Sequence, residues 1–279
     1  MVEFPADYEF GKLLAGRHDV DLVQLMLEFA EDAYPNLDRL ACVMEIDRLS
    51  VACDPKSFVA LKKPDVRTTL TAVSRVLYDL EGFHGNREAY YEPQNSYLND
   101  VLTRRCGIPI SLGILYMAVA SRVGLKMFGA NTPGHFVVGC QTESDVLFVD
   151  PFTNGDILDR AGCKQRIEQI LRQAGAVANE HFRPASPVDV AARVLRNLKA
   201  AHAMSNRWHD ALTVQRRLAA LLPQFPQERR DLGLIYLRVG QPKLALKSLE
   251  EYRQHCGSEQ TVALEASIRT AKKMIVELN

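Results

Sequence analysis

A histidine and an aspartate lie in two short apolar segments that the sequence predicts to pair as a β-hairpin. The segment GHFVVGC holds His135, DVLFVDPF holds Asp150, and QTES lies between them. If residues 141–144 form the loop, Cys140 faces Asp145 and His135 lies directly opposite Asp150. Opposed residues have Cβ atoms about 4.5–5.5 Å apart, which allows a hydrogen bond between imidazole and carboxylate. Such a bond fixes the tautomer of the imidazole, so the pair is two-thirds of a catalytic triad.

The candidate for the third member, a nucleophile, is Cys106. It follows Arg104 and Arg105 and precedes the Gly-Ile-Pro that begins a predicted helix. Helix N-termini stabilise thiolates through their unsatisfied N–H groups and the macrodipole. The order Cys106, His135, Asp150 is that of a papain-like or transglutaminase-like thiol enzyme. Cys106 would attack an amide or ester acyl group, His135 would act as general acid and base, and Asp150 would orient the imidazole.

Four motifs resemble the SirB family of bacterial proteins: GIPISLGILY at 107–116, RVGL at 122–125, PGHF at 133–136 and VDPF at 149–152. The resemblance covers most of the chain from about Val20 onward. It implies a transglutaminase-like core followed by tetratricopeptide repeats, with His135 and Asp150 at the family's histidine and aspartate positions. It implies no substrate.

The resemblance does not extend to the nucleophile. In active transglutaminase-like enzymes the cysteine lies about fifteen residues before the glycine that ends its helix. That count, taken back from Gly124, reaches Pro109. Cys106 is three residues early, about 4.5 Å at about 1.5 Å per residue, so it could face the same cleft or point away. Ser111 is two residues late, about 200° around the helix, and is not expected to point at His135.

Each candidate also has a structural interpretation, and these alternatives stay open. Cys106 could be a semi-buried loop thiol, because free cysteines often behave as small apolar residues. The pair of His135 and Asp150 could be a hydrogen-bonded clamp at the edge of the sheet. Arg104 and Arg105 could be a solvated or interface pair instead of an anion site. The long loop EGFHGNREAYYEPQNSYLND could be a lid over a substrate cleft or packing that covers the sheet.

Hydrophobic periodicity predicts the elements around the hairpin. Apolar residues recur at intervals of three and four over residues 20–80, which indicates a helical layer. A buried helix follows, with Pro109 in its first turn and Gly124 just past its end. Short apolar runs then predict strands at 125–129, 136–140 and 146–149. We expect the sheet to close at Gly155. The fold class is therefore α+β, with N-terminal helices and a small antiparallel sheet in a papain-like core.

The sequence EHFRPASP at 180–187 reads as a proline-bearing linker. We therefore expect two domains, residues 1–180 as the helical layer and core, and residues 188–279 as helical repeats. Ala211 and Ala245 begin similar segments 34 residues apart. This spacing is the period of the tetratricopeptide helical hairpin, and a final helix over 261–278 would cap the array.

Composition limits the classes of partner. The 34 basic and 34 acidic residues balance, so no global field favours nucleic acid or an anionic membrane surface. Six cysteines without a C-x-x-C pair favour reduced thiols over a zinc site or a disulfide framework. The N-terminus does not resemble a secretory signal, and the apolar stretch 108–130 is too polar to span a bilayer. We expect a cytoplasmic protein with no metal and no cofactor.

Two functions fit these features. The first is a protein-binding or regulatory module with absent or weak catalytic activity, which binds a protein or peptide through its helical repeats. The alternative is an active thiol acyl-transferase or amide hydrolase that uses Cys106, His135 and Asp150. A purely structural scaffold would leave the histidine–aspartate pair without a purpose. The sequence indicates no particular oligomeric state.

Overall fold

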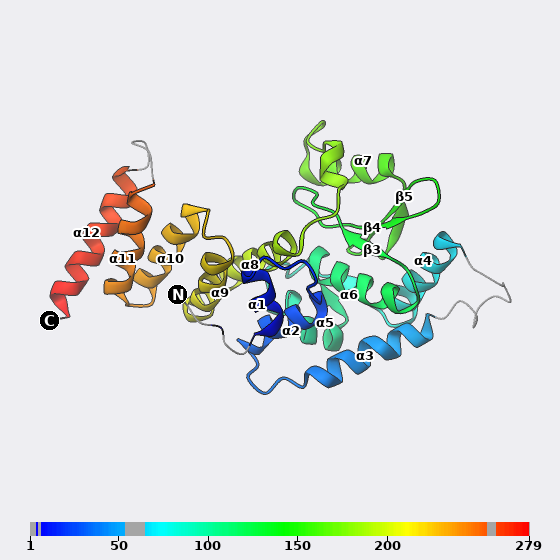
Figure 1. The fold of residues 1–279 in the computed structure, drawn as a ribbon, viewed down its shortest axis with the longest axis horizontal. Coiled ribbons are helices and arrows are strands. Elements are labelled where there is room, and N and C mark those ends of the chain that lie inside the picture. Colours follow the sequence, from blue (N-terminus) through cyan, green and yellow to red (C-terminus); the bar gives the residue numbers. More distant parts are fainter. Residues whose placement is uncertain (1–3, 5–6, 54–64, 256–260, 279) are drawn as a thin grey trace. The chain divides into compact units, whose positions relative to one another are not determined.

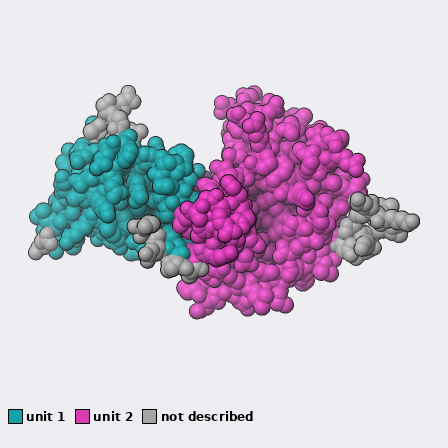
Figure 2. Space-filling view, viewed as in Figure 1, with its two compact units in different colours: residues 1–6, 195–279 teal, residues 7–194 magenta. Residues whose placement is uncertain are grey.

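The computed structural model describes Phe4 and residues 7–53, 65–255 and 261–278 of the protein. These residues form two compact units (Figure 2). The larger unit comprises residues 7–194, and the smaller one comprises residues 195–279 together with Phe4. The predicted α+β fold with C-terminal helical repeats is confirmed.

Helices make up the first part of the larger unit (Figure 1). In sequence order they are α1 (Tyr8–Leu14), α2 (Leu22–Glu31), α3 (Arg39–Ala52), α4 (Val66–Ser74), the π-helical turn η2 (Arg75–Leu80), the 3₁₀ turn η3 (Pro93–Asn95) and α5 (Leu98–Arg104). An aspartate begins three of them, because the side chains of Asp21, Asp38 and Asp65 accept hydrogen bonds from backbone N–H groups of the first turn. Two short strands, β1 (His84–Gly85) before η3 and β2 (Cys106–Gly107) after α5 in the sequence, pair in parallel with each other.

The predicted buried helix is α6 (Pro109–Arg122). Pro109 occupies its first turn and Gly124, with a φ of 89°, follows its end, as the sequence predicts. Gly113 leaves room for the sheet, because a Cβ there would lie 2.8 Å from the ring of Phe136. Neither α6 nor any other helix in the described part of the protein is long and apolar enough to cross a bilayer.

The sheet has one strand more than the sequence predicts. Its strands lie in the order β3 (Met127–Gly129), β4 (Val138–Gln141), β5 (Val146–Asp150) and β6 (Asp156–Leu158), and all neighbours are antiparallel. The backbone does not leave the sheet at Gly155. Asn154 and Gly155 instead reverse it, with φ values of 52° and 71°, and Gly155 N–H donates to the carbonyl oxygen of Asp150 at 3.0 Å. The next three residues therefore return alongside β5, before α7 (Arg160–Leu171) and the 3₁₀ turn η4 (Asn179–Phe182).

The predicted pairing of β4 with β5 is wrong by two residues. Cys140 lies opposite Leu147 and not opposite Asp145. The cause is in the loop, where Thr142 N–H donates to the carbonyl oxygen of Asp145 at 2.7 Å and Asp145 N–H donates to Thr142 Oγ1 at 3.0 Å. These bonds close the turn one residue later on each strand than expected. Because a shift of two keeps each side chain on its face of the sheet, His135 stays on the expected side although it precedes β4.

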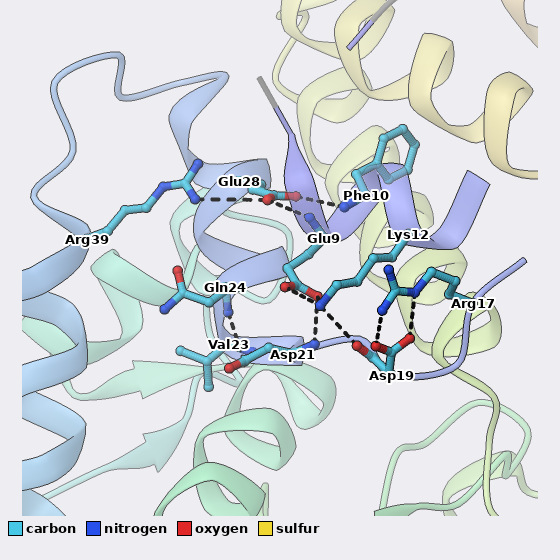
Figure 3. Close-up of polar contacts among 10 residues, drawn as sticks. All are labelled: Glu9, Phe10, Lys12, Arg17, Asp19, Asp21, Val23, Gln24, Glu28 and Arg39. Carbon is cyan, nitrogen blue, oxygen red and sulfur yellow. Dashed lines mark hydrogen bonds and ion pairs between the residues drawn. The ribbon is translucent and has the colours of Figure 1, made fainter. Parts of the chain in front are cut away.

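A buried carboxylate of α2 holds the short helix α1 (Figure 3). Glu28 is 1% exposed, and its two oxygens accept from the backbone N–H groups of Glu9 and Phe10, both at 2.8 Å. These N–H groups lie in the first turn of α1, where a helix provides no internal partner. Burial raises the pKa of Glu28, while the two backbone bonds and Arg39, 3.9 Å away on α3, act against that rise. One polar group thus connects three N-terminal helices.

The segment predicted to be a linker, residues 180–187, packs as part of the larger unit. Ala185 N–H donates to the carbonyl oxygen of Gly129 at 2.8 Å, so the backbone follows the edge of the sheet. The two units divide inside α8 (Pro187–Met204), after Val194. The predicted domains, 1–180 and 188–279, therefore differ from this division, because backbone pairing holds residues 184–185 against residues 129–130 at the end of β3.

The smaller unit consists of helices packed in sequence. After the last part of α8 they are α9 (Trp208–Leu221), α10 (Pro226–Arg238), α11 (Pro242–Arg253) and α12 (Thr261–Glu277). Ala211 in α9 and Ala245 in α11 are both fully buried. Gly233 in α10 permits a close helix crossing, because a Cβ there would lie 2.7 Å from Leu249 Cγ. Small residues therefore lie where the predicted 34-residue repeat requires them.

Gly155→Ala is expected to destabilise the larger unit by more than the cost of its backbone conformation. At a φ of +71°, the added Cβ would lie 2.6 Å from Ser74 Oγ and against the ring of Tyr78. We expect a loss of about 3 kcal/mol of unfolding free energy, of which about 1 kcal/mol comes from the positive φ and the rest from overpacking. Urea denaturation followed by circular dichroism measures the loss.

The matched control is Gly16→Ala. Gly16 has a φ of +72°, and an added Cβ would meet no atom within 4 Å, so this variant bears only the backbone cost. Equal losses in the two variants would show that packing around the turn after β5 does not limit the substitution.

Candidate functional site

The structure joins His135 and Asp150 in a buried pair. His135 Nε2 lies 2.9 Å from Asp150 Oδ1, with His135 3% exposed and Asp150 fully buried. His135 stands two residues from direct opposition, and an imidazole is long enough to reach such a diagonal neighbour. The turn before β4 presents the ring: Thr132 Oγ1 donates to the carbonyl oxygen of His135 at 2.7 Å, and Gly134 has a φ of +65°. The expected contact is therefore made through a different register.

The carboxylate of Asp150 is surrounded by donors. Apart from the imidazole, it accepts from Phe152 N–H and from the Thr153 hydroxyl, both at 3.1 Å, and Arg166 Nη1 lies 3.6 Å from Oδ2. Burial alone would raise the pKa of Asp150, but the bond to His135 and the other donors prevail, and this pKa lies below its usual range. An ionised carboxylate accepts hydrogen from Nε2, so Nδ1 is the ring nitrogen left for other partners.

His135 lines a pocket of about 720 Å³ in the larger unit. The loop that follows β1 forms one wall with Tyr90 and Tyr91, so it borders a cavity. Phe152, which follows β5, and Arg166 of α7 also line the pocket. Across the described residues, no group of three or more His, Cys, Asp and Glu side chains is placed to hold a metal ion. What the pocket offers is one imidazole nitrogen, cationic side chains and aromatic surface.

The start of α6 meets this pocket at Pro109. Pro109 is also the position reached by the spacing at which transglutaminase-like enzymes carry their cysteine. A proline has no nucleophilic atom and no backbone N–H. No cysteine is among the described residues that line the pocket. This end of α6 therefore provides neither a thiol nor an N–H group from its first residue.

Cys106, the predicted nucleophile, lies outside the lining of the pocket. It belongs to β2, is 7% exposed and pairs with His84 of β1. Cys106 is therefore not among the described residues that form the pocket with His135.

The two arginines before the thiol are held by carboxylates. Arg104 forms an ion pair with Glu92, and Arg105 forms ion pairs with Glu45 and Glu81. Arg105 also has a φ of 58°, uncommon for a residue other than glycine. These contacts fix the turn that leads from α5 into β2. Their charges are occupied within the fold, which favours the structural interpretation of this pair.

Sequence reasoning missed Asn95, which ties the aromatic loop to the start of α6. Asn95 is fully buried, and its Nδ2 donates to the carbonyl oxygens of Ala89 at 2.7 Å and Tyr90 at 3.2 Å. The backbone carbonyl oxygen of Asn95 accepts a hydrogen bond from Ser111 Oγ at 2.6 Å. Ser111 is therefore bound to the loop and does not line the pocket. The one signal available was a polar residue inside a loop of unusual length.

Comparisons with known proteins agree with this architecture. A family model described as transglutaminase-like superfamily matches residues 40–196, and one described as tetratricopeptide repeat matches residues 198–269. A UPF0162 protein of Xylella fastidiosa (strain 9a5c) is 34% identical over 242 residues, which are 84% of this chain and 83% of that protein. Protein SirB1 of Salmonella typhimurium is 27% identical over 204 residues, 72% of this chain and 76% of its own. The SirB resemblance is thereby confirmed.

A further relative shares less of the sequence. F-box only protein 21 of Homo sapiens is 38% identical over 113 residues, which are 38% of this chain and 18% of that protein. No solved structure matches.

Asp150→Asn is expected to destabilise the larger unit, because the amide puts a donor among groups that all donate. We expect a loss of about 2–4 kcal/mol of unfolding free energy at neutral pH. The pKa of Asp150 is lowered by folding, so its carboxylate stabilises the fold above its unfolded pKa, and this contribution disappears as the pH falls through the folded pKa. The difference between the wild type and the variant should therefore shrink as the pH falls below about 4, the usual pKa of an unfolded aspartate.

Chemical denaturation at a series of pH values measures this difference. Asp156→Asn is the control, because the Asp156 side chain is 47% exposed and its ion pair with Arg166 lies at the surface. That variant should lose less than about 1 kcal/mol. A difference for Asp150→Asn that does not change with pH would contradict the role of its ionised form.

Proposed function

Because the chain belongs to the transglutaminase-like superfamily, we propose that it is a cytoplasmic protein-binding or regulatory module whose core has absent or weak catalytic activity. One observation carries this proposal: the pocket beside the histidine–aspartate pair meets the start of α6 at Pro109, and its described lining contains no cysteine. A thiol mechanism needs its nucleophile within hydrogen-bond reach of the imidazole. With proline at that place, the pair is suited to hold a ligand group and not to activate a nucleophile.

The helical repeats support a protein or peptide as the partner. Stacked helical hairpins present an extended surface along which a polypeptide can lie. Residues 195–279 carry fourteen basic and eight acidic side chains, an excess that the balanced composition of the whole protein hides. An acidic partner fits this excess better than a basic one. The five cysteines that the structure describes are free thiols, which supports a reducing compartment.

Thiol chemistry is the second candidate function, and the bond between His135 and Asp150 is the observation that favours it. In this alternative His135 takes the proton of the Cys106 thiol, and the sulfur attacks the carbonyl carbon of an amide or ester. The C–N or C–O bond breaks as His135 passes that proton to the leaving amine or alcohol, and water or an amine then releases the acyl group from the thioester. The mechanism requires β2 to rearrange so that the thiol enters the pocket. Cys106, His135 and Asp150 would be the catalytic residues.

Alkylation kinetics distinguish the two candidates. For a binding module, we expect iodoacetamide at neutral pH to modify Cys106 no faster than a free thiol in solution, since Cys106 is 7% exposed and lies outside the pocket that His135 lines. Replacing His135 with glutamine should leave that rate unchanged. Peptide mapping by mass spectrometry gives the rate at each cysteine, and the half-buried Cys42 is the comparison within the same protein.

A different result would favour the enzyme. Rapid modification of Cys106 that slows in folded His135→Gln protein would make thiol catalysis the better proposal. A melting curve of the variant confirms that it is folded.

Removal of the C-terminal helices tests the role of the repeats. A truncated protein that ends after Met204 keeps α8 but lacks α9 to α12. In a pull-down, the full-length protein should retain protein partners that the truncated protein loses. Identical partner sets from the two would contradict the assignment of binding to the repeats.

A further inference from the structure

Among the described residues that line the pocket, one cation has a charge that no neighbouring carboxylate offsets. Arg87 is exposed and lines the pocket, and among the residues that the structure describes it forms no ion pair with a carboxylate. Its guanidinium carbon lies 5.1 Å from the centroid of the Phe152 ring, so the aromatic ring supports the charged group. Arg166 also lines the pocket, but two carboxylates offset its charge, because its Nη1 lies 2.7 Å from Asp156 Oδ2 and 3.6 Å from Asp150 Oδ2. Within the described lining, the uncompensated charge is therefore that of Arg87.

The same pocket contains a buried polar atom that can bind a ligand. His135 is 3% exposed, and its bond to Asp150 occupies Nε2 alone. Nδ1 is therefore the nitrogen available from the pocket side. When both ring nitrogens carry hydrogen, Nε2 donates to Asp150 and Nδ1 can donate to a second anion on the other side of the ring.

Apolar surface lies next to these donors. Tyr90, Tyr91, Phe152 and Ile170 line the pocket, and Tyr91 and Ile170 are 51% and 48% exposed. Such a surface favours a ligand with an apolar group beside its charge. A planar guanidinium matches the two oxygens of a carboxylate.

We propose that this pocket binds a carboxylate of a polypeptide, next to an apolar side chain, through Arg87 and His135. This inference rests on the proposed binding function and names the chemistry of the ligand. The carboxylate accepts from the guanidinium of Arg87 and from Nδ1 of His135, which takes up a proton from solvent as the carboxylate binds. The neighbouring apolar side chain packs against Tyr90 and Phe152. Both the C-terminus of a polypeptide and an acidic side chain supply this chemistry.

Three peptides test the proposal with the full-length protein. They are acetyl-Ala-Ala-Leu-Phe with a free C-terminal carboxylate, the same peptide as its C-terminal amide, and acetyl-Ala-Glu-Leu-Phe amide. Isothermal titration calorimetry should show binding of at least one carboxylate peptide, with the uncharged amide about tenfold weaker or worse. Binding of the first peptide alone assigns the C-terminus, and binding of the third alone assigns an acidic side chain. Either result supports the proposal.

Variants connect the binding to this pocket. Arg87→Gln should weaken the carboxylate peptide about tenfold, and Arg87→Lys should weaken it less because the charge remains. Arg67→Gln is the matched control, since Arg67 is exposed on α4 and does not line the pocket. In the unmodified protein, the NMR signals of the His135 ring should shift on addition of the carboxylate peptide and not on addition of the amide.

Several results would overturn the proposal. These are equal binding of the uncharged amide, no binding of any of the three peptides, unchanged affinity in Arg87→Gln, or an unmoved His135 ring signal. Slow alkylation of Cys106 together with any of them would leave the binding module in place and remove only the carboxylate ligand. Rapid alkylation that depends on His135 would instead remove the proposed function itself.

Discussion

A carboxylate shielded from water must be surrounded by hydrogen-bond donors. In the larger unit, the donors around the buried Asp150 determine how several elements are positioned. Its donors come from the imidazole before β4, from the turn after β5 and from α7. Three elements that are separate in the sequence are therefore fixed relative to one acceptor. The orientation of His135, and with it the nitrogen that faces the pocket, is a consequence of that constraint.

A second buried polar residue, Asn95, positions the wall of the pocket that the loop after β1 forms. The fully buried Asn95 bonds the aromatic loop on one side and the first turn of α6 on the other. Tyr90 is therefore placed by a backbone bond and not by its own packing alone. The wall of the pocket is therefore positioned by hydrogen bonds within the fold.

Much of this arrangement follows from local patterns in the sequence. Pro109 and Gly124 predict the ends of α6, because each favours a particular backbone conformation by itself. The 34-residue spacing predicts the helical hairpins, because a repeat is visible in the sequence alone. The register of β4 and β5 does not follow, because it depends on side-chain bonds inside a four-residue turn. The prolines of residues 180–187 suggest a linker, yet tertiary contacts hold this segment against the sheet. The position of Cys106 outside the described pocket lining does not follow either, because β2 is too short to leave a periodic pattern.

The bond between His135 and Asp150 stabilises the fold whether or not any reaction takes place beside it. A lineage could therefore exchange the nucleophile for another residue while selection for folding preserves its two partners. A shared histidine and aspartate are therefore not, by themselves, evidence of hydrolytic activity. In this architecture, the residue in the first turn of the buried helix, here Pro109, says more about thiol chemistry than the histidine–aspartate pair does.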